Sequence, residues 1–198
     1  MNIDFLIKKF KKCLNDEAII FDDKIYHYSD ILTLIDGWTE IIKNNKIAPG
    51  MVIAITGDYS PDAIAVIIAL IVNKNIIVPL STLAEVHYDE YFNTSQTQYV
   101  INLSGQNYSI IKKNGVPRNN KILNKLIELS HPGLILFTSG SSGKPKAVLH
   151  DFDKLMSKYI QPSKKHRTLC FLMFDHIAGI DTYFYCLFSG GTIIFPVS

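Results

Sequence analysis

Residues 51–80 hold three apolar segments in succession, and this pattern restricts the fold more than any other feature of the sequence. The outer two, 51–56 and 76–80, are apolar except for one terminal threonine. The run 63–72 between them follows Ser-Pro-Asp at 60–62, which supplies a capping serine, a first-turn proline and a first-turn acid. Strands without a polar face are buried on both sides, as in parallel sheets covered by helices. The pattern therefore predicts strand–helix–strand and an α/β fold, with αβα layers and a largely parallel sheet.

Strand and helix patterns alternate along the whole chain, without an internal repeat or a low-complexity linker. We therefore treat residues 1–198 as one unit. The polar stretch 113–120, which contains a glycine and a proline, is the best candidate for an internal boundary. The helix expected before residue 73 ends at Asn73-Lys74-Asn75. We expect an asparagine to make the left-handed turn there, because asparagine tolerates that conformation almost as glycine does.

The composition is that of an ordinary globular protein, with 47% hydrophobic and 19% charged residues and a net charge of +2 over 198 residues. Such a chain can bury a core, and without a basic stripe it makes no case for nucleic-acid binding. Its longest apolar run is too short to span a membrane. The cysteines at 13, 170 and 186 are widely spaced and form no C-x-x-C motif, which favours a reduced, cytoplasmic protein.

The strand expected at 133–137 runs directly into a loop of hydroxyl residues and glycines that ends in lysine. Glycines let backbone N–H groups approach an anion, hydroxyls add hydrogen-bond donors, and a lysine adds positive charge for phosphate. A flexible Gly/Ser linker seldom follows a buried strand in this way, so the segment predicts a polyphosphate-binding loop. Its candidate ligands are Thr138, Ser139, Gly140, Ser141, Ser142, Gly143 and Lys146.

Two other loop motifs do not match this segment. A Walker A loop has glycines farther apart than Gly140 and Gly143, and its lysine precedes serine or threonine, whereas Lys144 precedes Pro145. A G-x-S-x-G nucleophile elbow also fails, because no serine of the segment has a glycine both two residues before it and two residues after it.

The loop instead resembles the signature T-S-G-[ST]-[ST]-G-x-P-K-G of the AMP-forming adenylating superfamily. That superfamily comprises acyl- and aryl-CoA synthetases, the adenylation domains of peptide synthetases, and luciferases. The loop departs from the signature at Ala147, where glycine is usual. Further segments resemble the family's N-terminal subdomain in order and spacing: 24–32, 47–55, 60–62, 69–70, 78–80, 174–179 and 187–192.

This resemblance implies an ATP-dependent, AMP-forming carboxylate ligase. Members join a small-molecule carboxylic acid to AMP, usually with Mg²⁺, and pass the acyl group to the thiol of CoA or of a carrier protein. It further implies that Thr138–Gly143 hold the β- and γ-phosphates of ATP and that Lys146 neutralises them.

Two adjacent residues, Asp175 and His176, are alternative candidates for contact with the substrate. The segment 174–179 resembles the F-H-x-x-G pattern of acyl-CoA synthetases, which implies that His176 lies beside the carboxylate and the α-phosphate. In peptide-synthetase adenylation domains a nearby aspartate binds the substrate amino group, which implies this role for Asp175 instead. From the residues alone, Asp175 could also cap the following helix, with His176 in its first turn. The other histidines have no metal-ligand spacing, so no metal site is expected.

The resemblance also implies an enzyme longer than this chain. The family's adenine contacts, its Mg²⁺-binding glutamate and its C-terminal domain have no counterpart here, so we expect no Mg²⁺ ligand and little activity from the chain alone. A separately encoded C-terminal half is a candidate partner, and an uncovered sheet edge would favour self-association. The alternatives are a non-catalytic nucleotide-phosphate-binding module and an inactive interaction remnant. Whether the chain is itself an enzyme is left open.

Overall fold

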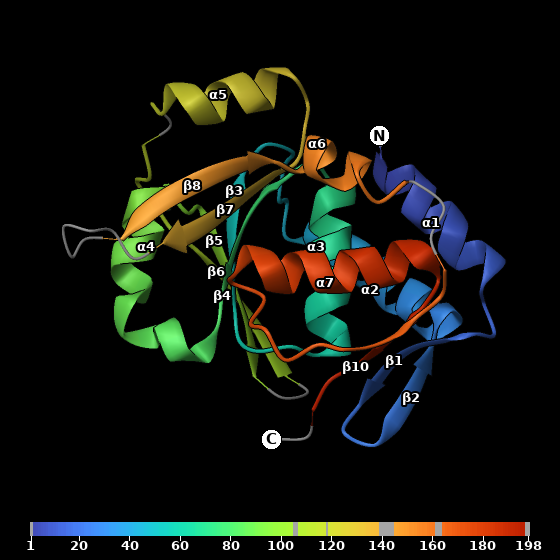
Figure 1. Ribbon diagram of the computed structural model, residues 1–198. Helices are drawn as coiled ribbons and strands as arrows, with labels where there is room; N and C mark the ends of the chain where they lie inside the picture. The colour runs from blue at the N-terminus through green and yellow to red at the C-terminus, as the bar shows by residue number, and fades with distance from the viewer. Residues whose placement is uncertain (1, 105–106, 118, 139–144, 161–163, 197–198) are drawn as a thin grey trace.

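The computed structural model describes residues 2–104, 107–117, 119–138, 145–160 and 164–196, and it contains two β-sheets flanked by helices (Figure 1). The six-stranded sheet has the order β6-β5-β3-β4-β7-β8 and the four-stranded sheet the order β2-β1-β10-β9. The elements are α1 (Asn2–Lys12), β1 (Glu17–Phe21), β2 (Lys24–His27), α2 (Tyr28–Asn44), β3 (Val52–Thr56), α3 (Pro61–Val72), β4 (Ile76–Leu80), η1 (Thr82–His87), α4 (Tyr88–Ser95), β5 (Tyr99–Ser104), β6 (Asn107–Lys112), α5 (Lys121–Glu128), β7 (Gly133–Thr138), β8 (Lys146–Asp151), α6 (Phe152–Ser157), β9 (Arg167–Leu169), α7 (Ile177–Ser189) and β10 (Thr192–Ile194).

The central strands of the larger sheet are parallel, as the apolar segments predict. Strand β3 pairs in parallel with both β4 and β5, and β4 pairs in parallel with β7. The edge strands β6 and β8 are antiparallel to their neighbours. The predicted α/β class with a largely parallel sheet is confirmed. The division of the strands between two sheets is an additional finding, because β1 pairs in parallel with β10 near the other end of the chain.

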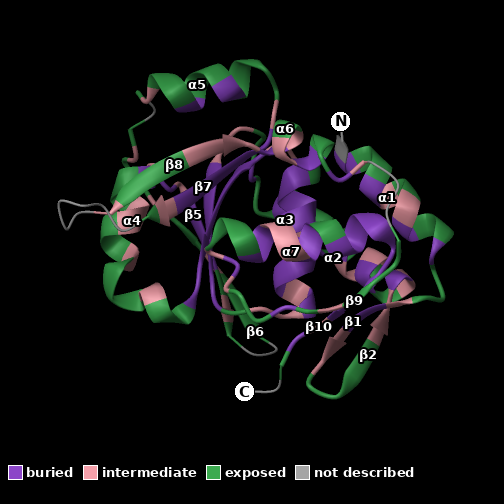
Figure 2. Ribbon diagram, in the orientation of Figure 1, coloured by how far each residue is buried: buried purple, intermediate pink, exposed green. Residues whose placement is uncertain are grey.

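Helices cover both faces of the six-stranded sheet, so the predicted αβα layering is present. Alternate residues of β3 point to opposite faces: Ile53 and Ile55 join a cluster with α2, α3 and α7, whereas Val52 and Ala54 join a cluster with α5. Figure 1 shows α4 and α5 on one side of the sheet and α3 and α7 on the other. Figure 2 shows α3 buried along its length, as expected for the apolar run 63–72.

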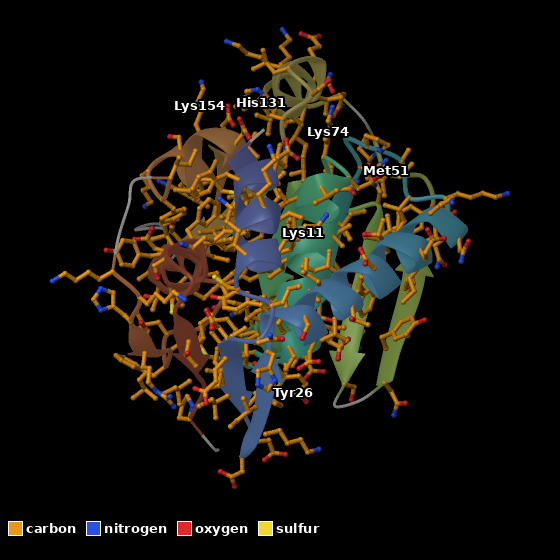
Figure 3. The ribbon with its side chains drawn as sticks, turned by 90° about the vertical axis from the view of Figure 1, so that its right-hand side faces the viewer. Lys11, Tyr26, Met51, Lys74, His131 and Lys154 are labelled. Atoms are coloured by element: carbon orange, nitrogen blue, oxygen red, sulfur yellow. The ribbon has the colours of Figure 1, made fainter. Side chains whose placement is uncertain are left out.

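The start of α3 forms as predicted. The Ser60 hydroxyl accepts a hydrogen bond of 3.0 Å from the N–H of Ala63, and Pro61 occupies the first turn. The turn after α3 differs from the prediction. The residue with the positive φ is Lys74, at 61°, and not one of the two asparagines beside it. Figure 3 labels Lys74 at this turn, close to Met51.

The asparagines stabilise this turn through their side chains instead. Asn75 is fully buried, and its amide donates to the carbonyl oxygens of Ala48 at 2.8 Å and Met51 at 3.3 Å. Its own carbonyl accepts from the Asn73 amide at 2.8 Å. The polar groups of the buried Asn75 side chain are satisfied in this way, so the left-handed position falls to the residue between the two asparagines.

Residues 113–120 connect β6 to α5, and a boundary there stays a prediction. Among the described residues, no helix combines the length and the apolar character that crossing a membrane would require.

We predict that Asn75→Ala lowers the free energy of unfolding by about 2–3 kcal/mol, because it leaves the Ala48 carbonyl and the Asn73 amide without their buried partner. Urea unfolding followed by circular dichroism measures the change. Lys74→Gly at the same turn should instead stabilise the protein by up to about 1 kcal/mol, because it relieves the left-handed backbone. An Asn75→Ala protein as stable as the wild type would contradict this account.

Candidate active site

A cleft of about 530 Å³ lies at the carboxyl ends of β4 and β7. Its walls come from four segments: the end of β4, η1 with the start of α4, the end of β7, and the loop before α7. Because β4 and β7 are parallel neighbours, their carboxyl ends meet at one edge of the sheet. Crevices outside the carboxyl ends of parallel strands are the usual ligand sites of open α/β sheets.

The predicted phosphate loop begins at this cleft. Thr138, the last residue of β7, lines the cleft wall, and its Cα partner across the β7–β8 hairpin is Lys146. The structure therefore brings the two ends of the predicted loop together, and both residues are exposed. The remaining candidates, Ser139, Gly140, Ser141, Ser142 and Gly143, lie outside the described residues.

One wall of the cleft is a stack of aromatic rings. Tyr91 of α4 lies against Phe137 of β7 with ring centroids 3.9 Å apart and an angle of 8° between the planes. His87 also stacks on Tyr91, with ring centroids 5.6 Å apart. The stack ties α4 to the strand that leads into the loop, so the residue before Thr138 is held by packing.

The facing wall contains a carboxylate that is anchored on the end of β4. Asp175 Oδ2 accepts hydrogen bonds from the backbone N–H of Ser81 at 3.1 Å and from its hydroxyl at 2.5 Å. The carbonyl of Ser81 in turn accepts from the hydroxyl of Tyr88 at 2.8 Å. Burial raises the pKa of Tyr88 to about 12, and the neighbouring negative charges of Glu85, Asp58 and Asp175 add to this effect. The phenol therefore stays protonated and keeps Ser81 in place at neutral pH.

The structure places Asp175 and His176 together at the cleft, and both line it. Asp175 is not the cap of α7, so that alternative is wrong. Position 176 is the N-cap of α7, and no side chain caps the helix there. The Asp175 side chain turns instead to Ser81, because two donors lie at the end of β4.

A glycine sets the distance between α7 and this wall. A Cβ atom at Gly179 would lie 2.1 Å from the carbonyl oxygen of Met173 and 2.8 Å from that of Leu172. Only a residue without a side chain lets the first turn of α7 pack so closely on the backbone of 172–173. This contact explains the glycine of the 174–179 segment in physical terms.

Sequence analysis did not identify most of the residues that line the cleft, among them Ser81, Tyr91 and Phe137. One signal was available for Ser81, which is the first polar residue after the apolar strand 76–80 and so lies at its carboxyl end. Tyr91 and Phe137 give no comparable signal, because aromatic residues in a helix and a strand are usually core residues.

A family model described as AMP-binding enzyme matches residues 8–198. The chain belongs to this AMP-binding enzyme family. The predicted resemblance to adenylate-forming enzymes is thereby confirmed. Among curated relatives, a nonribosomal peptide synthetase, GRA1 of Gibberella zeae, is 24% identical over 96% of this chain and 3% of its own length. An acetyl-coenzyme A synthetase of Pyrobaculum arsenaticum is 49% identical over 37 residues, 19% of this chain and 6% of its own.

Solved structures show the same fold as this AMP-binding family member. The N-terminal subdomain of Klebsiella oxytoca NpsA in complex with 3-hydroxyanthranilyl-AMSN superposes with a TM-score of 0.79 at 20% identity, covering 98% of this chain and 52% of that one. The o-succinylbenzoate CoA synthetase MenE of Bacillus subtilis, in complex with the acyl-adenylate intermediate OSB-AMP, superposes with a TM-score of 0.75 at 16% identity. The superposition covers 98% of this chain and 55% of MenE. The chain thus spans about half of each of these solved structures, and the expected resemblance to an N-terminal subdomain is confirmed.

We predict that Gly179→Ala destabilises the protein by about 1–3 kcal/mol, because the added methyl group must displace the backbone at 172–173. Backbone amide NMR shifts of 173–176 should change with it. Gly37→Ala is the matched control, because Gly37 also lies in a helix but a Cβ there would have no atom within 4 Å. We expect this change to raise the free energy of unfolding by about 0.5–1 kcal/mol. A Gly179→Ala protein with wild-type stability and unchanged shifts would contradict the proposed contact.

Proposed function

We propose that this chain forms the phosphate-binding part of an ATP-dependent, AMP-forming carboxylate ligase. The observation that carries the proposal is the hairpin β7–β8, which pairs Thr138 with Lys146 and brings Thr138 into the wall of a cleft at the carboxyl edge of the parallel sheet. In the reaction, a carboxylate oxygen bonds to the α-phosphorus of ATP while the bond to pyrophosphate breaks, which yields acyl-AMP. Family membership supports this reaction class.

The proposed roles follow from the chemistry of the side chains. The hydroxyls and backbone N–H groups of 138–143 would donate hydrogen bonds to the β- and γ-phosphates. Lys146 would compensate their negative charge, and among the described residues it has no ion-pair partner that would compete. Stabilisation of charge at the phosphates, together with positioning of the carboxylate, supplies most of the catalysis in phosphoryl transfer.

The described residues do not by themselves provide a metal site. No group of three or more His, Cys, Asp or Glu side chains within them could hold a metal ion. Mg²⁺ is often bound by only one or two carboxylates together with substrate phosphates, so the Mg²⁺ of the family would have to enter largely with ATP.

We further propose that the complete reaction needs protein groups beyond this chain, because the chain spans only half of the structures that it matches. A polypeptide that supplies the other half is the proposed partner. Transfer of the acyl group to CoA or to a carrier-protein thiol would follow in the assembled enzyme. The matched relatives include an acetyl-coenzyme A synthetase and a nonribosomal peptide synthetase, so the two acceptors remain alternatives within the proposal.

The test is ATP binding, measured by isothermal titration calorimetry on the folded chain. We expect Lys146→Ala to weaken binding about tenfold, since a charge-assisted contact to phosphate contributes on the order of 1.4 kcal/mol. Lys112→Ala is the matched control, because Lys112 is also an exposed lysine on an edge strand of the same sheet, at the opposite edge. No binding of millimolar ATP to the folded wild-type chain, or equal losses in the two variants, would refute the proposal.

A further inference from the structure

The two oxygens of the Asp175 carboxylate have different surroundings. Oδ2 accepts both hydrogen bonds from Ser81, and so the carboxylate is fixed on the end of β4. Oδ1 is buried and has no hydrogen-bond partner among the described residues. An unpaired buried carboxylate oxygen is costly, because it has lost water without gaining another donor.

The imidazole of His176 is the nearby group that can supply this donor. Its Nε2 lies 3.7 Å from Asp175 Oδ1, beyond hydrogen-bond distance but within reach of a small side-chain rotation. The His176 side chain is 69% exposed and lines the cleft, so it is free to rotate, whereas the Asp175 side chain is 15% exposed and held by Ser81. Hydrogen bonds of this kind are often long in ligand-free sites and shorten on binding.

We propose that Asp175 is a positioning residue that orients the His176 imidazole. Asp175 Oδ1 accepts a hydrogen bond from the Nε2–H group of His176, and the Nδ1 atom of the ring then faces the cleft. In the neutral ring Nδ1 is a hydrogen-bond acceptor, and in the protonated ring it is a donor to an anionic oxygen. That this oxygen belongs to a phosphate or a carboxylate rests on the proposed function.

This arrangement gives the two adjacent residues different tasks. Asp175 holds the ring through Oδ1 and is itself held by Ser81 through Oδ2, so both oxygens are engaged within the protein, and Oδ1 is buried. His176 is the residue that touches the ligand. A carboxylate that fixes the tautomer and the orientation of a histidine in this way is a common supporting arrangement in functional sites.

The tautomer of His176 tests the proposal without any ligand. NMR shifts of the imidazole nitrogens, measured on ¹⁵N-histidine-labelled protein at a pH where the ring is neutral, distinguish the Nε2–H form from the Nδ1–H form. We expect the wild-type ring to be in the Nε2–H form alone. We predict that Asp175→Asn inverts it: the amide oxygen keeps the bonds to Ser81, and the amide NH₂ group replaces Oδ1 and donates to Nε2, which selects the Nδ1–H form.

Asp58→Asn is the matched control. Asp58 likewise binds the residue after Ser81: its Oδ1 accepts a hydrogen bond from the N–H of Thr82 at 3.1 Å, and its Oδ2 accepts one from the Thr82 hydroxyl at 2.6 Å. Asp58 does not line the cleft, and so its replacement should leave the His176 tautomer unchanged.

A wild-type ring that averages between the two tautomers would overturn the proposal, and this outcome is decisive even if Asp175→Asn does not fold. Unchanged nitrogen shifts in a folded Asp175→Asn protein would overturn it as well. ATP plays no part in this experiment. Failure of ATP binding would therefore refute the proposed function without contradicting the Asp175–His176 pair. A His176 tautomer other than the expected one would refute the pair without contradicting the proposed function.

Discussion

The parallel pairing of β4 with β7 is the constraint on which the site depends. The register joins Ile76 to Gly133 and Ile77 to Leu134, and both strands then run to the same edge of the sheet. A Cβ at Gly133 would lie 2.7 Å from a methyl group of Leu126 and 3.0 Å from Ile76, so a glycine there allows α5 and β4 to pack closely. Because the strands are aligned in this way, Ser81 and Thr138 emerge side by side at the cleft. The parallel pairing of β4 with β7 therefore positions both Ser81, which anchors Asp175, and Thr138, where the predicted phosphate loop begins.

The wall that contains Asp175 is held by contacts between parts of the chain that are far apart in sequence. Ser81 binds Asp175, and the bare backbone of Gly179 lets α7 approach the turn at 172–173. The aromatic stack of Tyr91 on Phe137 holds the strand that precedes the loop. The described walls of the cleft are thus set by packing and hydrogen bonds before any ligand arrives, which lowers the cost of organising charge around a bound nucleotide.

Local sequence patterns were sufficient to predict individual helices and strands, but not which strands that are distant in sequence pair with one another. The run 63–72 and the Ser-Pro-Asp start were enough to place α3, and the apolar segment 133–137 was enough to place β7, but the pairing of β7 with β8 was not predicted. The second sheet had no such signal, because β1 and β10 lie at opposite ends of the chain. The turn at Lys74 was missed for another reason: the left-handed preference of asparagine competes with the use of its side chain as a buried hydrogen-bonding group, and at Asn75 the second effect prevails.

The same limit applies to Asp175 and His176, which a family resemblance alone could not assign. The partner of Asp175 is 94 residues away, so no local pattern could show that its carboxylate turns toward β4. Once this contact is known, the two residues are no longer alternatives, because one points to the end of the strand and the other to the cleft. If Asp175 is engaged by Ser81 and His176, as we propose, both of its oxygens are bound within the protein, and its buried Oδ1 is poorly placed for a substrate amino group. The acid that this site accepts then need not carry an amine, and its carboxylate would be recognised through the imidazole.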